Sequence, residues 1–406
     1  MDRPSPDKAC SELAPIEIGL VIIGRMDRID KQAIRLAREQ LLVWLQEQFP
    51  QFAWRISAVQ REEVPLSIRQ EPSALLRDGS DLRDAEGWDF AILFTAADLT
   101  CRYKPYSIAV TSSALDLAVV STNRIDPHAF DAEVDESERV HTVAQRLTTL
   151  CIRSLGHLNG LATAREENNF MHIPSSPKEL AKMREFDSDQ HSAIENNLHQ
   201  IADPRLEETQ AAEKLSPFRF YLQSAYINRH EIADAVLHAR PWEFPLRLLR
   251  LTAAAVSTTT LLMLTAETWH LASYQAIATL AMLLGVVLAV TTALVAVRQR
   301  LLIRRRRSLM REQIVITNCS AVLIVLLGLA STAAALLALN LSAGYLLYPL
   351  SLVAAWIESD IGMVMSTTYW QVALFVTTLG LFIGALGATF EEQHHFRHVV
   401  FVDEEI

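Results

Sequence analysis

Apolar and polar positions divide this chain of 406 residues into two unlike parts. Up to about residue 240, short apolar runs alternate with charged stretches. From about 246 to 390, long runs of Leu, Ala, Val and Thr dominate, and charges are confined to short clusters. The second part accounts for the hydrophobic content of 50%. This pattern predicts a soluble domain followed by a membrane domain.

Strand-like and helix-like patterns alternate in the first part. Short apolar runs rich in β-branched residues predict strands at 16–24, 52–59, 88–95, 107–113 and 117–122. Residues 60–87 are charged and are expected to be irregular. After a flexible tail over 1–14, this order predicts an α/β domain over 15–187.

Two amphipathic helices are expected between these strands and after them. The first runs to about Gln48, with Asp30 as its N-cap, and the second runs from near Glu136 to Gly160. A polar, helix-compatible connector with a juxtamembrane segment is expected over 188–245.

The second part predicts an all-α transmembrane domain of four helices. Its long apolar runs place the spans at about 246–265, 276–297, 314–339 and 371–390. The apolar segment 345–357 is only half a span long and is expected to be interfacial or re-entrant. Residues 391–406 are expected to form a solvated tail.

Arginines between the second and third spans predict the orientation. They are Arg298, Arg300, Arg304, Arg305, Arg306, Arg307 and Arg311. Such clusters mark cytoplasmic loops and also attract anionic lipid headgroups. With four spans, both termini are then cytoplasmic, in a bacterial-type inner membrane. The first residues lack the apolar core of a secretory signal, which agrees with this orientation.

Other features narrow the function classes. A net charge of −10 argues against a nucleic-acid partner. The four cysteines form no C-x-x-C pair, so neither a disulfide framework nor a cysteine zinc site is indicated. The span interiors carry no ionisable residue, which weighs against a transporter. The pair Gly380 and Gly384 is a small-residue packing pattern that would also suit a homo-oligomer.

The region from Asp89 to Phe186 resembles the archaemetzincins, a family of zinc-peptidase-like proteins. The matching pieces occur in the family's order and are Phe90–Phe94, Ala118–Arg124, Arg146–Leu161, Asn169–Pro174 and Glu179–Phe186. The resemblance implies a zincin-like fold. It also implies a helix bearing H-E-x-x-H-x-x-G-x-x-H, in which three His bind zinc and the Glu is the general base.

Most of this motif is missing here. The first ligand position is Arg153, the general-base position is Ser154 and the third ligand position is Thr163, while His157 and Gly160 remain. One imidazole cannot hold a catalytic zinc, and a fixed guanidinium repels a divalent cation. We therefore expect no catalytic residue, no metal and no cofactor. A helix-end histidine and a helix C-cap account for His157 and Gly160 without any chemistry.

Three functional hypotheses are compatible with these features. The leading one is a pseudo-metallopeptidase domain that binds a protein, a peptide or a small ligand through Arg153, His157, Gly160 and Met171, the last at the family's methionine-turn position. The second is an active membrane-anchored zinc peptidase in which His157 binds metal with His141 or His172. The third is a transport or channel component that the soluble domain regulates.

Overall fold

The computed structural model describes residues 14–61, 68–127, 135–202, 217–303, 312–359, 366–388 and 393–406. The chain forms two compact units. The first comprises Met1–Leu215 together with Val402–Ile406, and the second comprises Ser216–Phe401. The five residues Val402–Ile406 were expected in a solvated tail, and the structure places them in the soluble unit instead.

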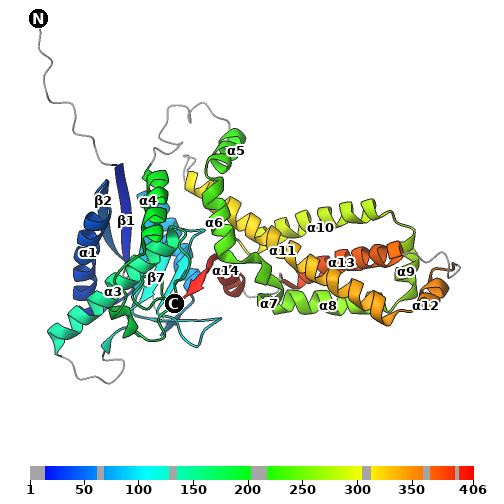
Figure 1. Cartoon of the computed structure of the whole chain (residues 1–406), viewed down its shortest axis with the longest axis horizontal. Coiled ribbons are helices and arrows are strands. Elements are labelled where there is room, and N and C mark those ends of the chain that lie inside the picture. Colours follow the sequence, from blue (N-terminus) through cyan, green and yellow to red (C-terminus); the bar gives the residue numbers. More distant parts are fainter. Residues whose placement is uncertain are drawn as a thin grey trace, which may run out of the picture. The chain divides into compact units, whose positions relative to one another are not determined.

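The first unit is built on a six-stranded sheet with the order β2-β1-β4-β7-β6-β8 (Figure 1). The strands are β1 (Ala14–Ile23), β2 (Phe52–Arg61), β4 (Phe90–Thr95), β6 (Ala109–Ser112), β7 (Leu117–Ser121) and β8 (Glu404–Glu405). The strands β2, β1, β4 and β7 are parallel, whereas β6 is antiparallel to both of its neighbours. A second sheet pairs β3 (Arg69–Gln70) with β5 (Asp98–Leu99). The predicted α/β class is confirmed.

Helices cover both faces of the large sheet because alternate strand residues are apolar on both faces. On one face, α1 (Arg28–Gln48), α3 (Glu136–Leu158) and α4 (Ser188–Ala202) bury a core with Ile18 and Ile92. On the other face, α2 (Pro72–Glu86) packs on β4, where its Gly79 leaves room for Leu93.

Two expectations for this unit are wrong. Residues 72–86, which were expected to be irregular, form α2, with Pro72 in its first turn and Gly87 at φ +80° after its end. Helix α2 carries many charged and few large apolar side chains, so its sequence shows no clear apolar face that would predict a helix. The N-cap of α1 is Asp27 instead of Asp30, and its carboxylate accepts the Asp30 N–H at 2.7 Å.

Helices alone make up the second unit where the structure describes it. Its long members are α8 (Leu249–Met263), α10 (Ile277–Arg298), α11 (Glu312–Leu347) and α13 (Ser366–Ala388). The shorter ones are α5 (Pro217–Ile227), α6 (Arg229–Ala239), α7 (Phe244–Arg247), α9 (Ala266–Ser273), α12 (Leu350–Trp356) and α14 (Gln393–Phe401). The long helices lie side by side, with α9 and α12 at one end of the bundle (Figure 1).

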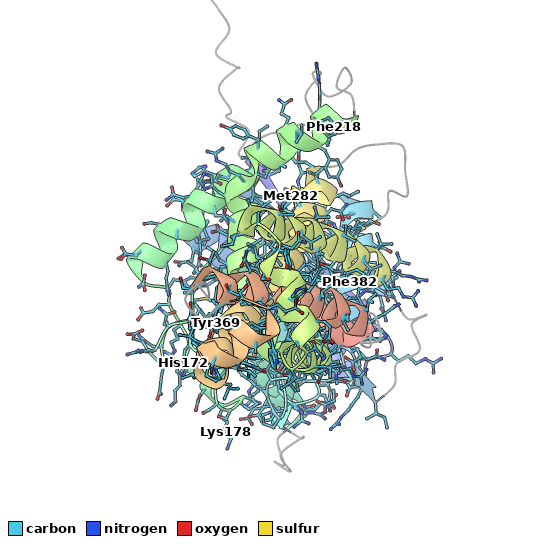
Figure 2. All side chains as sticks on the ribbon, turned by 90° about the vertical axis from the view of Figure 1, so that its right-hand side faces the viewer. His172, Lys178, Phe218, Met282, Tyr369 and Phe382 are labelled. Carbon is cyan, nitrogen blue, oxygen red and sulfur yellow. The ribbon has the colours of Figure 1, made fainter. Side chains whose placement is uncertain are left out.

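Three helices are long and apolar enough to cross a membrane, namely Ile277–Arg298, Glu312–Leu347 and Ser366–Gly387. A fourth crossing exists if Arg229–Arg247 and Leu249–Met263, which meet at a bend of 51°, count as one span. The outer face of α10 carries a stripe of exposed apolar side chains that includes Met282, Val286 and Val290; Met282 and Phe382 of α13 are labelled in Figure 2. Such a stripe is suited to lipid.

The segment 345–357 is not a single re-entrant piece. Its first residues end α11, the chain turns at Tyr348 and Pro349, and α12 follows. Tyr348 packs on the fully buried Trp269, with ring centroids 5.1 Å apart, and Tyr369 packs on the same indole at 5.7 Å. This aromatic cluster holds the end of the bundle together.

Candidate functional site

The last turns of α3 carry the positions that the sequence singled out. Arg153 and Ser154 are fully buried, and His157 is 5% exposed. Residues four apart share a face of a helix, so Arg153 and His157 lie next to each other. The helix is fixed there because Leu147 and Leu150 before them are also fully buried in the core.

Gly160 ends this helix. Its φ is +83°, its N–H donates to the His157 carbonyl at 2.9 Å, and the Leu161 N–H donates to the Gly156 carbonyl at 3.1 Å. These two bonds define a Schellman motif, which favours glycine at the left-handed position. The glycine therefore has a conformational role that requires no ligand.

Arg153 is paired with a carboxylate from β8. Its Nη1 donates to Glu404 Oε2 at 2.9 Å and its Nη2 donates to Oε1 at 3.0 Å, while Nε donates to the His172 carbonyl at 3.0 Å. Burial acts to raise the pKa of Glu404, but the charge and hydrogen bonds of Arg153 outweigh it, so this pKa lies below its usual value. The first ligand position of the family's motif thus holds a bidentate ion pair.

His157 lies between two carboxylates of the same segment. Its Nε2 is 3.7 Å from Asp403 Oδ2, and its Nδ1 is 3.7 Å from Glu404 Oε2. Both distances are longer than an N–H···O hydrogen bond. The side chain of Asp403 is 1% exposed, and its Oδ2 accepts the Ser113 N–H at 2.5 Å. The predicted binding residues Arg153 and His157 therefore face the last residues of this chain.

The other predicted site residues have separate places. Met171 is fully buried beneath α3, where its sulfur would lie 2.8 Å from a Cβ added at Gly156. Thr163, the third ligand position, is exposed. His141 is also exposed, and it lies on α3 about 24 Å along the helix axis from His157. A metal site that combines His141 with His157 is excluded by this separation.

The donors around α3 do not fit a catalytic zinc. Such a site needs three protein ligands and an open position. Here the first position is a cation, the third points to solvent, and the general-base position is a buried hydroxyl. Within the described ranges, no three His, Cys, Asp or Glu side chains are grouped so that they could hold a metal ion.

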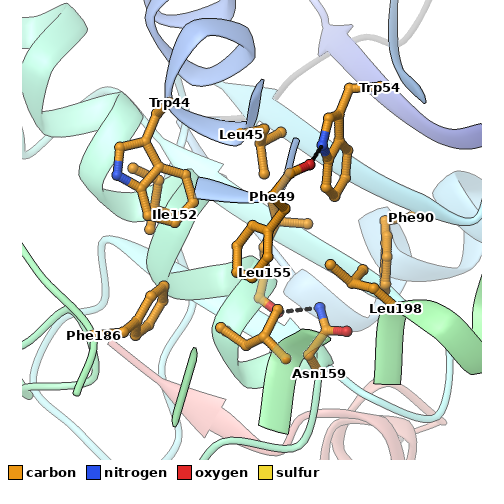
Figure 3. Close-up of a pocket in the computed structure, with 12 residues that line it drawn as sticks. Trp44, Leu45, Phe49, Trp54, Phe90, Ile152, Leu155, Asn159, Phe186 and Leu198 are labelled. Atoms are coloured by element: carbon orange, nitrogen blue, oxygen red, sulfur yellow. Dashed lines mark hydrogen bonds between the residues drawn. The ribbon is translucent and has the colours of Figure 1, made fainter. Parts of the chain in front are cut away.

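Two other features beside α3 offer no chemistry. Burial raises the pKa of the Cys151 thiol to about 12, so it is not a nucleophile at neutral pH. A cavity of about 10 Å³ is lined by apolar side chains including Trp44, Trp54, Leu155 and Phe186 (Figure 3). This volume holds at most one water molecule, so it is a packing defect and not a ligand pocket.

The sequence reasoning missed Asp403, Glu404 and Glu405. Two signals in the sequence pointed toward them. Arg153 stands on the apolar face of a helix between Ile152 and Leu155, and a buried guanidinium requires an anionic partner. The apolar run 399–402 before the three carboxylates is the other signal, because solvated tails rarely contain one.

The predicted residues of the membrane part lie at a helix end and on a helix face. Arg298 and Arg300 lie at the end of α10, whereas Arg304–Arg307 and Arg311 fall outside the described residues. Gly380 and Gly384 face α8 of the same chain, where an added Cβ would lie 2.3 Å from Thr259 Cγ2 and 2.8 Å from Ala255 Cβ, respectively. This packing face is therefore used within the chain.

Comparison with solved structures finds archaemetzincin-like proteins. A zinc-dependent peptidase from Methanocorpusculum labreanum is 17% identical, covers 44% of this chain and 99% of its own, and has a TM-score of 0.35. An archaemetzincin from Methanopyrus kandleri is 18% identical over 46% of this chain and 97% of its own, with a TM-score of 0.35. The archaemetzincin of Archaeoglobus fulgidus is 15% identical over 44% and 99%, with a TM-score of 0.31.

The resemblance expected from the sequence is thus found, at low identity. No family profile matches the chain, and no curated protein matches it. With TM-scores below 0.5, these structures say nothing about chemistry here. The chemistry of the site is set by the residues of this chain alone.

Proposed function

We propose that this chain is an integral membrane protein whose soluble unit is a non-catalytic binding module in the cytoplasm. The observation that carries the proposal is the buried pair of Arg153 and Glu404 at the end of α3. A site built for hydrolysis would need a metal or a base at this place. This site instead holds a strand of peptide by charge and backbone hydrogen bonds.

The path of the chain supports an even number of membrane crossings. Strand β8 follows the membrane unit in sequence, yet it belongs to the same sheet as β1. A folded sheet cannot have strands on both sides of a bilayer. The chain must therefore leave and return on one side. Of the three or four candidate spans, this condition favours four, and we take Leu249–Met263 with its preceding bent helix as the first.

Contacts within the second unit agree with this count. Arg397 of α14 donates to the Gln299 carbonyl at 3.2 Å and to the Arg300 carbonyl at 3.0 Å. The ring of His395 is 3.3 Å from the Arg247 carbonyl. The entry to the bundle, its exit and the loop after α10 therefore meet at one end.

The same end carries the arginines. Arg298 and Arg300 lie there, and the sequence continues with the basic run 304–311. By the positive-inside rule we expect this end to face the cytoplasm, and we propose that the soluble unit and both termini lie on the same side. The same arginines would bind anionic headgroups of a bacterial inner membrane.

Metal content and peptidase activity of the purified full chain test the non-catalytic assignment. The whole chain is needed because residues 1–215 alone lack β8. We expect trace zinc that is equal in the wild type and in a His157→Ala variant, and no cleavage of a casein substrate. Near-stoichiometric zinc that disappears in His157→Ala would overturn the proposal and favour a rearranged metallopeptidase. Protease protection in vesicles tests the orientation, since the soluble unit should be cut only after permeabilisation in right-side-out vesicles.

A further inference from the structure

Each residue of the segment Asp403–Ile406 makes its own contacts with the rest of the first unit. Its backbone pairs antiparallel with β6 at the edge of the sheet. The Asp403 N–H donates to the Thr111 carbonyl at 3.0 Å, and the Ile406 N–H donates to the Ala109 carbonyl at 2.8 Å. This is the geometry in which an extended peptide adds a strand to a sheet, and its main-chain bonds give affinity without sequence preference.

The side chains provide the preference. Glu404 meets the fully buried guanidinium of Arg153 in a bidentate pair. This guanidinium cannot turn to solvent, because its Nε is bonded to the His172 carbonyl and the side chain is 0% exposed. An uncharged residue at this position would leave a buried cation unpaired, which is among the costliest defects in a protein interior.

Glu405 is held by the backbone. Its Oε1 accepts the Arg102 N–H at 2.8 Å, and its Oε2 accepts the N–H groups of Tyr103 at 3.0 Å and Lys104 at 3.1 Å. Consecutive backbone N–H groups that converge on one group form an anion-binding concavity. Only a carboxylate can accept all three of these bonds at once.

The two ends of the segment are also recognised. Asp403 accepts the Ser113 N–H at 2.5 Å. The side chain of Ile406 is 3% exposed and lies in the main core of the first unit. The binding groups therefore select an acidic residue at three successive positions and an apolar residue at the fourth.

All of these binding groups lie in residues 102–172. They belong to β6, to the loops on either side of it, to α3 and to the loop after α3. The binding surface is thus complete in the continuous part of the soluble unit, and the bound segment reaches it after about 190 intervening residues of connector and membrane unit. Strand β8 itself has only two residues and lies at the edge of the sheet, so we expect the segment to dissociate without unfolding of the other strands.

We propose that β6, Arg153 and the 102–104 N–H groups form a binding site for an acidic, strand-forming peptide of the type Asp-Glu-Glu-Ile, and that the chain's own segment Asp403–Ile406 is its resident ligand. The proposal deepens the non-catalytic binding function and rests on it. A peptide of the same type from another protein competes for the site when the resident segment dissociates. The resident segment is part of the same chain, so its binding is intramolecular and competitors bind well only when it is withdrawn.

The test uses the full chain in nanodiscs and a fluorescent peptide of sequence FVDEEI. A variant that stops after Phe401 exposes the site and should bind the peptide at least about tenfold more tightly than the wild type. Adding Arg153→Met to this truncation should weaken binding by about 30-fold or more, because one partner of a buried charge pair is removed. The peptide FVNQQI has nearly the same shape but lacks the charges, so it should bind the truncated chain more weakly than FVDEEI by a similar factor.

A second variant covers the case in which truncation unfolds the sheet. Glu404→Lys retains residues 402–406 but places a second cation next to Arg153. The repulsion should release the segment, so this variant should also bind FVDEEI. Thermal unfolding identifies which variants remain folded. A folded variant that ignores FVDEEI, or that binds FVNQQI equally well, would overturn the inference.

These outcomes separate the inference from the function on which it rests. Binding of intact FVDEEI supports both. Binding followed by cleavage would keep the peptide site and overturn the non-catalytic assignment. Absent binding by folded variants that also lack zinc would overturn the peptide site and leave the non-catalytic assignment standing.

Discussion

Two arginines of the soluble unit are fully buried, and they obtain their partners in different ways. Arg83 of α2 bonds Asp84 at 2.8 Å and Asp116 at 3.0 Å, and it also donates to the Leu115 carbonyl. Arg153 of α3 obtains its carboxylate from Glu404, 251 residues further along the chain. One guanidinium is neutralised by its immediate fold, and the other by a segment that arrives from beyond the membrane unit.

The two arginines therefore differ in whether their carboxylate partners can leave while the sheet stays folded. The partners of Arg83 lie on α2 and beside β7, so they cannot leave unless the sheet unfolds. The partner of Arg153 lies on a two-residue edge strand, and our proposal is that this strand dissociates while the rest of the sheet stays folded. A buried charge without a partner is costly. If that strand dissociates, the Arg153 guanidinium loses its carboxylate and favours binding of another anion.

The largest expected effect comes from replacing the two arginines in turn by methionine. Arg83→Met leaves the Asp116 carboxylate without its cation, and we expect a loss of about 3–5 kcal/mol in the free energy of unfolding. Arg153→Met should release the segment 402–406 while the rest of the sheet stays folded. Thermal unfolding of the full chain, with hydrogen exchange read at residues 402–406 and at β4, distinguishes the two. Equal loss of protection at β4 in both variants would contradict the comparison.

Asp30 supplies a buried charge of a third kind. Burial is the main cause that raises its pKa from 3.8 to about 6, with the nearby Asp27 adding to the shift. A raised carboxyl pKa means that the folded state holds a proton which the unfolded chain has released, so its contribution to stability falls as pH rises from about 4 to 6. Asp30→Asn keeps an acceptor for the Thr122 hydroxyl, which is bonded at 2.9 Å.

We therefore expect Asp30→Asn to stabilise the soluble unit by about 2 kcal/mol at pH 7 and to have little effect at pH 4. Denaturant unfolding at the two pH values checks this. A variant that is destabilised equally at both would show that the carboxylate is required as an anion, as the partners of Arg83 are.

Gly156→Ala perturbs α3 next to Arg153 without touching any charge. The added methyl group would lie 2.8 Å from Met171 Sδ and 3.0 Å from the Phe186 ring. Overpacking of this kind should cost about 1–2 kcal/mol of stability. The ion pair between Arg153 and Glu404 should persist. We therefore expect hydrogen exchange at the backbone amides of residues 402–406 to stay as slow, relative to the rest of the sheet, as in the wild type. Release of the segment by this variant would show that packing, and not charge, holds it.

Acidification below pH 4.5 should have the smallest effect of these changes, and we expect it at the segment 402–406. Burial acts to raise the pKa of Glu404, but Arg153, with smaller contributions from His157 and Lys104, holds this pKa below its usual value. A lowered carboxyl pKa gives stability that is present above the unfolded value of 4.5 and is lost as pH falls through the folded value. Segment docking, followed by hydrogen exchange at 402–406, should weaken below pH 4.5 and not between pH 5 and 7. The pKa shifts of Glu404 and Asp30 have opposite signs, so the pH dependence at Asp30 serves as an internal control for that at Glu404.

Much of the fold could be predicted from local pattern. The buried strands β1, β4 and β7 are continuous apolar runs, and α1 and α3 have clear apolar faces, so the α/β class can be derived from them. Helix α2 could not be predicted in this way because its residues 72–86 mix many charges with few large apolar side chains. Its helical state depends on tertiary contacts such as Gly79 against Leu93.

The site was predicted in part for a similar reason. The residues of α3 could be found because they are consecutive and resemble a known motif. Their partners could not, since nothing local connects Arg153 to Glu404. In the membrane unit, Gly380 and Gly384 were identified as a packing face, but the sequence does not say whether the opposite helix belongs to the same chain. Pairings between distant segments are the part that spacing and periodicity leave open.

The position of β8 has a consequence for how the protein is made. Ribosomes synthesise the chain from its N-terminus at roughly 5–20 residues per second, so roughly 10–40 s separate the end of α4 from the emergence of β8. During that interval β6 is paired with β7 only and its other edge is open, and exposed edges favour association with other chains. The sheet is completed only when all the candidate spans that precede β8 in the sequence have been synthesised.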